Sequence, residues 1–561
     1  MSSFPKHSFE QAYDHTFPPS PLQQHTDLPM ASERTPLIAP VTTNDSNVYD
    51  STAGSSSATE TDALLETGLA DQQQQQTGGR RLSSRSDTSP LSTRELTTKE
   101  LKILLRYSGP VVLTYALQNS MQLASLVSLG HMGSLELAAC SLASMFAAVT
   151  GWSVSLGAAT ALDTLCSQSY TSHHPHTIGL HLQRSILILM IFLIPIVAGW
   201  VVSEPIFTLL GQEQDLAKHA AMFLWGLVPG APAYLIFECV KKYLQAQGIM
   251  HASTYVLLIS SPINAFLNFL LVWNKDIGFG FMGAPIAISI SYWIMLILLL
   301  LYIRFVNGRQ GWGGWSWDAF TGWPGFLKLA VPGIMMVCTE WWAFELTSLA
   351  ASFFGTIALA AQSVVLQTSI LLYAVPFGVS IAASNRVGNL IGKGDHHSAK
   401  IASRVSIVLS ISLGMINSLI LIILKKRWGR LFSEDTEVVT TVAKILPLVA
   451  FFQISDGIAG VGGGVLRGVG LQHLGAILNA IAYYFLAFPV GYVLAFKLGW
   501  GLAGLWSALS LALWLVSIGE LWIILRTNWS AEVQKNKIRN DLLAKHKASI
   551  QAEIQREFPE N

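Results

Sequence analysis

Charged residues are scarce in this chain. Only 12% of its 561 residues are Asp, Glu, Lys or Arg, about half of the roughly 25% that is usual in soluble globular domains. A soluble protein of this length would need a charged surface that this composition cannot supply. Hydrophobic residues instead make up 51% of the chain, enough for about twelve bilayer spans of about 20 residues each. The composition therefore excludes a soluble protein and indicates a polytopic membrane protein.

Cysteine is also rare, and the N-terminal segment lacks the apolar stretch that a signal peptide would need. The four cysteines, Cys140, Cys166, Cys239 and Cys338, lie in apolar segments without metal-ligand spacing, so we expect buried thiols rather than a disulfide framework. The first 95 residues contain no apolar stretch, which argues against a signal peptide. Histidines gather in two loops but show no spaced ligand set, so we expect no metal centre.

Residues 1–97 are rich in Ser, Thr, Pro and Gln and carry few large apolar side chains. Such a segment cannot bury enough surface to offset its ordering entropy, so we predict a disordered cytosolic tail. Two stretches within it resemble acidic dileucine sorting signals, which adaptors read as extended peptides. Their key residues are Glu33, Leu37 and Ile38 in the first and Glu60, Leu64 and Leu65 in the second. We therefore expect a sorting adaptor as a partner and residence in the vacuolar membrane, with the plasma membrane as the alternative.

Twelve apolar segments follow the tail, each long enough to cross a membrane as a helix. They cover residues 108–130, 137–162, 185–203, 219–240, 250–273, 283–303, 329–353, 358–382, 403–424, 445–465, 475–496 and 502–525. Most Lys and Arg residues fall on one side of these segments, which places both termini in the cytosol. One loop breaks that pattern, because Lys425, Lys426, Arg427 and Arg430 fall on the opposite side.

The two halves of the chain repeat each other. Pro110 is matched by Pro332 and Gly133 by Gly355, at one constant offset. The offset pairs the first segment with the seventh, an even shift, so both halves have the same membrane orientation. We therefore predict an all-α membrane protein of twelve transmembrane helices, in two pseudo-symmetric six-helix lobes around a central cleft. The predicted parts are the tail 1–97, an N-lobe 98–310, a cytosolic linker 311–328, a C-lobe 329–526 and a cytosolic C-terminal tail 527–561.

Acidic residues at membrane depth are the first functional candidates, because placing a carboxylate there costs about 2.5–3.5 kcal/mol on insertion scales. Glu340, Glu345 and Asp456 lie well inside predicted spans, and all three belong to the second half. The matching part of the first half offers the neutral Gln118 and Asn119. The sequence thus predicts a C-lobe that can titrate and an N-lobe that cannot.

The residues around these acids suggest two roles. Trp341 and Glu345 share a helix face, so a carboxylate beside an indole could hold a cationic aromatic substrate. The alternative is that Trp341 and Trp342 are interfacial or packing anchors. Asp456 precedes a glycine-rich run that permits close helix approach or local unwinding. Because removal from water favours the neutral form of a carboxyl group, Glu340 and Asp456 are candidates for proton exchange.

Several motifs, in order, make the chain resemble the eukaryotic branch of the multidrug and toxic compound extrusion (MATE) family. They are Gly130–Leu137, Asp163–Gln168, Glu340–Glu345, Arg386–Asn389 and Gly463–Gly468. The resemblance implies efflux of organic compounds against inflowing protons or sodium ions, with coupling-ion acids at Glu340 and Asp456. It also implies a second acid of cation exporters at Glu345. The sequence departs from mammalian cation exporters at Gln367, where they carry a glutamate, and from some prokaryotic members at Asn119, where they titrate an aspartate.

These observations together predict a proton-coupled antiporter that exports amphipathic organic compounds or drugs and needs no cofactor. Glu340 and Asp456 are the predicted proton-coupling residues. The predicted substrate contacts are Glu345, Trp341, Trp342, Gln367, Tyr373, Gln118 and Asn119. A sodium-coupled exporter and a lipid-linked flippase are the alternatives within transport. An intramembrane enzyme would need a nucleophile–base pair or a metal-ligand set, neither of which appears. We expect contacts with membrane lipids, no nucleic-acid partner and a monomer.

Overall fold

The computed structural model describes residues 92–172, 175–274 and 276–541. In these ranges every regular element is helical, and the four cysteines are free and buried, so the predicted buried thiols are confirmed. The proposed sorting motifs lie outside the described residues. The first described helix begins at Thr93, a few residues inside the segment predicted as a tail, and Ser92 caps it. The Ser92 side chain accepts from the backbone of Glu95 while the Glu95 carboxylate accepts from the backbone of Ser92, a reciprocal arrangement that satisfies two free donors.

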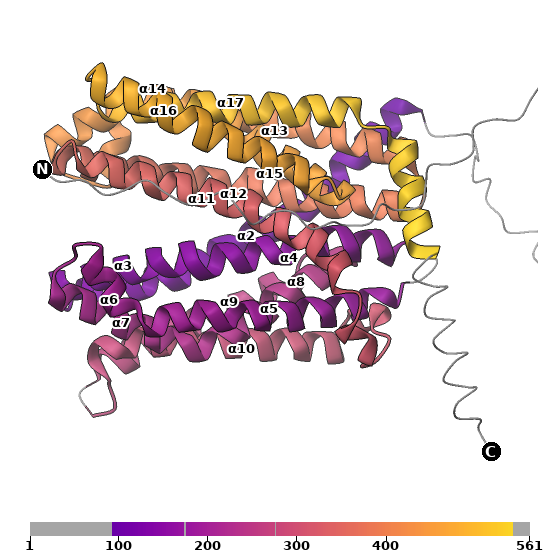
Figure 1. The fold of residues 1–561 in the computed structure, drawn as a ribbon, viewed down its shortest axis with the longest axis horizontal. Coiled ribbons are helices and arrows are strands. Elements are labelled where there is room, and N and C mark those ends of the chain that lie inside the picture. Colours follow the sequence, from indigo (N-terminus) through magenta and orange to yellow (C-terminus); the bar gives the residue numbers. More distant parts are fainter. Residues whose placement is uncertain (1–91, 173–174, 275, 542–561) are drawn as a thin grey trace, which may run out of the picture. The chain divides into compact units, whose positions relative to one another are not determined.

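The N-lobe, which we define as α2 to α10, lies mostly in the lower half of Figure 1. Its main helices are α2 (Thr93–Gly130), α3 (Ser134–Ala147), α4 (Ser153–Tyr170), α5 (Thr177–Val201), α6 (Ser203–Leu209), α7 (Gln214–Leu227), α8 (Ala231–Ala246), α9 (Ala252–Asn268) and α10 (Gly283–Phe305). The π-helical turn η2 (Ala148–Trp152) joins α3 to α4 within one span, and η3 (Val228–Gly230) joins α7 to α8.

The C-lobe, α11 to α17, repeats this plan. Its helices are α11 (Trp323–Ser352), α12 (Thr356–Gly392), α13 (His396–Trp428), α14 (Thr436–Val469), α15 (Gln472–Ala480), α16 (Phe488–Tyr492) and α17 (Leu502–Arg526). The π-helical stretches η9 (Ile481–Ala487) and η10 (Val493–Lys497) continue α15 and α16 into one span. Over the described ranges each lobe thus supplies six helical spans, and the predicted all-α fold of twelve helices is confirmed.

Eleven helical segments among the described residues are long and apolar enough to cross a membrane. The helix missing from that set is α2, which contains the first predicted span. Its middle carries Gln118, Asn119 and Gln122, and these polar side chains lower its mean hydropathy. The twelfth span is therefore recognised by its length and its place in the repeat rather than by apolar composition alone.

The first helix of each lobe begins against the other lobe. Leu96 and Leu104 of α2 are buried in a core cluster built from α12, α13, α14 and α17 of the C-lobe. Reciprocally, Phe326 and Ala330 at the start of α11 are buried in the main core of the N-lobe. Figure 1 shows α11 crossing from the upper lobe toward the lower one at the right-hand side. The two lobes therefore exchange the starts of their first helices.

The glycines of α14 permit close packing with α12, which leads to a stability prediction. A Cβ at Gly464 would collide with the backbone carbonyl of Ser380, whereas one at Gly199 of α5 would meet nothing within 4 Å. We expect Gly464→Ala to lower the free energy of unfolding by about 1–3 kcal/mol through overpacking. Gly199→Ala should be neutral or stabilising by up to about 1 kcal/mol, because alanine favours helix. Thermal unfolding in detergent measures both, and equal midpoints for the two variants would contradict the packing argument.

Candidate functional site

The structure brings together the two acids for which the sequence predicts proton coupling. Glu340 lies on α11 and Asp456 on α14, close enough for their charges to interact. Asp456 is 5% exposed. Tyr373 of α12 lies within electrostatic range of both carboxyl groups, so a third helix contributes to the same group. We call Glu340, Asp456 and Tyr373 the C-lobe acid site.

Glycines of α14 make this convergence possible. A Cβ at Gly460 would approach within 2.8 Å of the Tyr373 hydroxyl oxygen, so only glycine lets this ring lie directly against α14. Gly457 similarly faces the backbone of Ser410 on α13. The helix is continuous from Thr436 to Val469 and ends at Gly470, whose φ of +97° is left-handed. Of the two roles considered for the glycine run, close approach is the one that the structure shows.

Aromatic rings continue from the C-lobe acid site into the N-lobe. Tyr373 packs beside Phe377, with ring centroids 5.6 Å apart. Phe377 packs edge to face against Tyr115 of α2 at 4.8 Å, and the ammonium of Lys241 lies 4.4 Å from the centre of the Tyr115 ring. These rings form a continuous aromatic path across the interface between the lobes, and their faces attract cations.

The N-lobe carries its own buried charges. Lys241 and Glu238 of α8 form an ion pair of 2.7 Å in which both side chains are almost fully buried. Gln118 joins the pair, donating to Glu238 Oε1 at 3.0 Å and accepting from Lys241 Nζ at 3.3 Å. The sequence predicts an N-lobe that cannot titrate, and the structure adds that this lobe holds charged side chains buried in ion pairs. The sequence reasoning compared α2 with α11, whereas the N-lobe charges come from α4 and α8.

A second buried pair links this network to the C-lobe. Lys242 Nζ lies 2.8 Å from Asp163 Oδ2, and Arg467 Nε of α14 lies 3.8 Å from the same oxygen. Arg467 also donates to Ser380 Oγ at 2.8 Å and is within electrostatic range of Glu340. One carboxylate of the N-lobe is thus shared between a cation of its own lobe and a cation of the other.

The remaining predicted substrate contacts are spread along the lobes. Trp341 and Trp342 are 37% and 41% exposed, and the Trp342 indole donates to the carbonyl of Val149 in the N-lobe at 3.0 Å, so this tryptophan also joins the lobes. Glu345 is half-buried, and no hydrogen bond or ion pair to it occurs among the described residues. Asn119 and Gln367 are exposed. The geometry groups Tyr373 with the acids and Gln118 with the N-lobe pair.

Three residues near the C-lobe acid site were missed by the sequence reasoning. Glu520 of α17 is fully buried, packs against Gly462 and lies within electrostatic range of Glu340 and Arg467. Tyr483 of η9 is also fully buried, within electrostatic range of Glu340, Asp456 and Glu520. Arg467 could have been found from the sequence, because a cation at the end of a glycine-rich apolar helix requires a partner. Glu520 was not counted among the candidate residues because it lies near the end of its span.

The lobes are bonded together at one end, which we call the closed end. Thr164 at the end of α4 donates to the carbonyl of Arg467. Gln168 donates to the carbonyls of Gly468 and Val469 at 2.7 and 3.0 Å. A glycine again allows two helices to pack closely, here α12 and α4, since a Cβ at Gly388 would collide with the Ser167 side chain. Among the described residues, no hydrogen bond joins the lobes beyond the level of Val149 and Trp342, and the ribbons diverge toward the left of Figure 1.

Two further contacts reinforce the closed end. Glu100 of α2 is fully buried and forms a bidentate pair with Arg386 of α12, at 2.6 and 2.7 Å, the geometry in which arginine binds a carboxylate best. The helix at 529–541 packs on the bundle, and its Arg539 donates to Gln168 at 2.7 Å. Burial lowers the pKa of Arg539 to about 10, so it remains charged at neutral pH. This helix, which falls in the segment predicted as the cytosolic C-terminal tail, therefore packs on protein over its described residues.

The architecture and the site define a class of protein. Two repeated six-helix lobes are joined at one end and carry buried acids and bases at their interface, an arrangement typical of secondary transporters. Among the described residues, no three His, Cys, Asp or Glu side chains are placed to hold a metal ion.

Comparison with known proteins identifies the family. The MatE family model matches residues 110–270 and 332–493, once in each lobe. An uncharacterized transporter of Schizosaccharomyces pombe is 44% identical over 436 residues, which cover 78% of this chain and 81% of that protein. Human Multidrug and toxin extrusion protein 1 is 35% identical over 445 residues, 79% of this chain and 78% of that protein. This chain therefore belongs to the MATE family.

A solved structure supports the same assignment. The crystal structure of the eukaryotic MATE transporter AtDTX14 superposes with a TM-score of 0.76 at 30% sequence identity, covering 79% of this chain and 99% of that one. The resemblance deduced from the sequence motifs is confirmed.

Proposed function

We propose that this transporter exports amphipathic organic compounds from the cytosol in exchange for protons. The observation that carries the proposal is the C-lobe acid site, in which Glu340 and Asp456 lie within electrostatic range of each other. Two carboxylates whose charges interact repel each other when both are ionised, and removal from water adds to the cost. Proton uptake relieves both penalties, so the protonation state of this pair can be coupled to the arrangement of the surrounding helices.

The cargo class follows from the groups beside the acids. The aromatic path of Tyr373, Phe377 and Tyr115 offers flat apolar faces that suit organic rings and cations. Glu345 and the exposed Trp341 add a carboxylate and an indole further along α11. Amphipathic organic molecules, which combine a charged group with an apolar surface, match these aromatic and carboxylate groups best. Gln367 and Asn119, both exposed, are proposed as further polar contacts.

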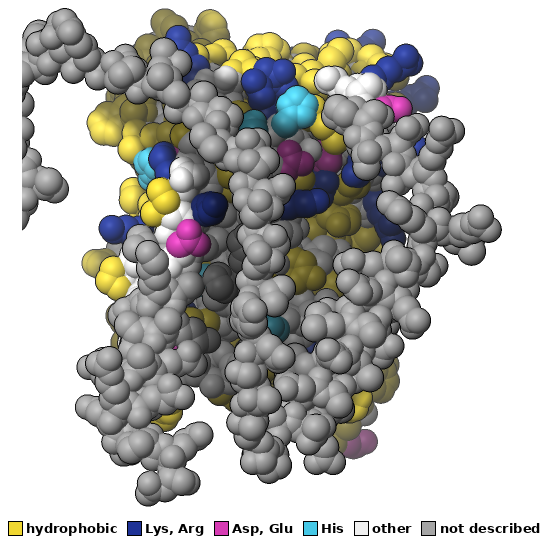
Figure 2. All heavy atoms as spheres, turned by 90° about the vertical axis from the view of Figure 1, so that its right-hand side faces the viewer, with side chains coloured by type: hydrophobic (Ala, Val, Ile, Leu, Met, Phe, Trp, Pro, Cys, Tyr) yellow, Lys and Arg dark blue, Asp and Glu magenta, His cyan; other side chains and the backbone are white. Residues whose placement is uncertain are grey.

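The contacts at the closed end support alternating access as the mechanism. The predicted topology makes that end cytosolic, and Figure 2, which looks onto it, shows Lys and Arg side chains at several places around its rim. In this conformation the lobes are bonded on the cytosolic side and diverge on the opposite side. Exchange would require the contacts that Thr164 and Gln168 make with the end of α14 to break as the lobes rock.

Gradient substitution in vesicles tests the coupling ion. Purified protein reconstituted in liposomes should accumulate a fluorescent organic cation when an outward proton gradient is imposed, and an outward sodium gradient at uniform pH should give no uptake above protein-free vesicles. A dependence on sodium alone would favour the sodium-coupled alternative, in which the same carboxylates act as ligands for a hard cation.

We propose the vacuolar membrane as the location, on the strength of the two dileucine-like motifs. Replacing Leu37 and Ile38, together with Leu64 and Leu65, by alanine should move a fluorescently tagged protein from the vacuolar membrane to the cell surface. Fluorescence microscopy of living cells measures the change in location.

The control for the sorting prediction removes the same number of aliphatic side chains from the same segment. It replaces by alanine four leucines that lie outside both motifs, namely Leu22, Leu28, Leu69 and Leu82. This variant should stay in the vacuolar membrane. Vacuolar residence of the variant that lacks both motifs would refute the sorting proposal without affecting the transport proposal.

A further inference from the structure

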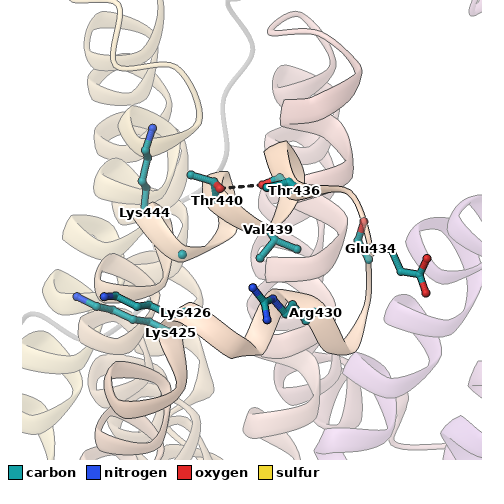
Figure 3. A pocket seen from close by; sticks show the side chains of 10 residues that line it. Lys425, Lys426, Arg430, Glu434, Thr436, Val439, Thr440 and Lys444 are labelled. Carbon is teal, nitrogen blue, oxygen red and sulfur yellow. Dashed lines mark hydrogen bonds between the residues drawn. The ribbon is translucent and has the colours of Figure 1, made fainter.

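A basic pocket lies between the end of α13 and the start of α14, at the end of the bundle opposite the closed end. It has a volume of about 670 Å³ and is lined by the cations Lys425, Lys426, Arg430 and Lys444, with Glu434 as its acid. Figure 3 shows Lys425 and Lys426 extending side by side from α13, while Glu434 points away on the other side of the turn. These are largely the residues that break the charge asymmetry of the loops.

The four cations of the basic pocket form no ion pair with any described residue. Asp435, the nearest other acid in the turn, caps α14 by accepting from the backbone of Glu437 at 2.8 Å and of Val438 at 3.4 Å. Four like charges around one cavity repel each other, and a bound anion would relieve that repulsion.

The surroundings of the basic pocket are apolar. Ile422, Ile423 and Leu424 occupy the turn of α13 just before the lysines, and Ile423 is 69% exposed. Leu431 follows Arg430 and is 72% exposed. A cationic cavity bordered by exposed aliphatic side chains at the end of a transmembrane hairpin suits a ligand with an anionic head and apolar chains, because the head can meet the cations while the chains cover the aliphatic side chains.

We propose that the basic pocket binds a phosphate group and that an anionic membrane phospholipid supplies it. The phosphate oxygens would accept from Lys425, Lys426, Arg430 and Lys444, and the acyl chains would lie along Ile423 and Leu431. The pocket is formed within the C-lobe by α13, α14 and the turn between them, and neither Glu340 nor Asp456 lines it, so it is a site separate from the coupling machinery. Lipid bound there would hold the α13–α14 hairpin at the membrane surface.

Binding of labelled lipid tests the proposal on the purified full-length protein. Fluorescence anisotropy in detergent would follow a labelled phosphatidic acid, with labelled phosphatidylcholine as the zwitterionic comparison. Each cation near an anionic headgroup is worth about fivefold in affinity, so Lys426→Gln/Arg430→Gln should weaken phosphatidic acid binding by about 25-fold. The matched control is Arg427→Gln/Lys497→Gln, which removes the same charge from residues that do not line the cavity and should bind within twofold of wild type.

The remaining arms distinguish the source of the phosphate and exclude misfolding. Inorganic phosphate at millimolar concentration should displace little lipid; if it displaces lipid fully, and direct phosphate binding is lost in the pocket variant, the ligand is a soluble phosphate and the lipid assignment is overturned. Equal binding of phosphatidic acid by wild type and pocket variant would overturn the whole proposal. Unchanged gel-filtration profiles and unfolding midpoints establish that the variants are folded.

Discussion

Glu340→Gln is expected to reduce proton-gradient-driven uptake of an organic cation at least tenfold, with Asp456→Asn giving a loss of similar size. An amide resembles the protonated carboxyl in shape and polarity but cannot release a proton, so either variant should hold the C-lobe acid site in one state. Binding of the cargo at equilibrium should change less than transport, about threefold at most, because the aromatic path is untouched. Uptake rates in liposomes with an imposed pH gradient, and cargo binding in detergent, measure the two effects separately.

The control for this prediction lies on the same helix as Asp456. Glu437 is exposed in the first turn of α14, so Glu437→Gln removes a carboxylate without disturbing the buried pair and should transport like wild type. Gradient-driven uptake that survives both Glu340→Gln and Asp456→Asn would overturn the assignment of coupling to these residues. A loss in the Glu437 variant as large as in the others would show that the assay reports surface charge rather than coupling.

Removing one partner of the Glu238–Lys241 pair should have the largest effect on stability. Glu238→Gln leaves the Lys241 ammonium fully buried without its paired carboxylate, and breaking a buried pair in this way typically costs about 3–5 kcal/mol. Lys241→Met should cost a similar amount because it strands the carboxylate. The double variant Glu238→Gln/Lys241→Met should recover most of the loss, since no unpaired charge remains. Thermal unfolding in detergent, followed by intrinsic tryptophan fluorescence, measures all three.

The C-terminal helix supplies a matched comparison. Lys535 and Glu532 have the same three-residue spacing and the same 2.7 Å separation, but Lys535 is 68% exposed. Glu532→Gln should therefore cost less than about 1 kcal/mol, as exposed pairs do. If Glu238→Gln and Glu532→Gln lowered the unfolding midpoint equally, burial would not be what gives the N-lobe pair its importance.

The sequence was sufficient to predict the architecture because the length of each span and the repeat of the two halves can both be recognised along the chain. Each predicted span coincides closely with a helical span of the structure, and Pro110 and Pro332 occupy equivalent helices of the two lobes. The predicted spans were mostly shorter than the helices, since several helices continue beyond the apolar core into polar turns. At α12 the apolar segment was predicted to end at 382, but the helix runs to Gly392, where its last turns pack against the other lobe.

The candidate site was only partly predictable because it depends on contacts between distant helices. Glu340 and Asp456 were found one by one as acids in apolar segments, and nothing in their own segments indicated that they meet. Lys241 and Lys242 follow directly after an apolar segment, and a search along the chain cannot show that Glu238 and Asp163 neutralise them within the bundle. Glu520 was passed over for a related reason, since its place near the end of a span gave no sign of its neighbours on α11 and α14.

The exchanged starts of α2 and α11 constrain how this transporter can open. Leu96 and Leu104 are embedded in the opposite lobe from the rest of their helix, and so are Phe326 and Ala330. The lobes therefore cannot separate at the closed end as two rigid bodies. Separation requires either that these side chains leave their cores or that both helices bend along their length. Pro110 and Pro332 each lack the amide hydrogen that would complete the helical ladder, so they mark matching weak points. Because each lobe holds the start of the first helix of the other, the two helices would bend in the same way when the lobes reorient. The embedded starts of α2 and α11 would stay in place while the rest of each helix moves.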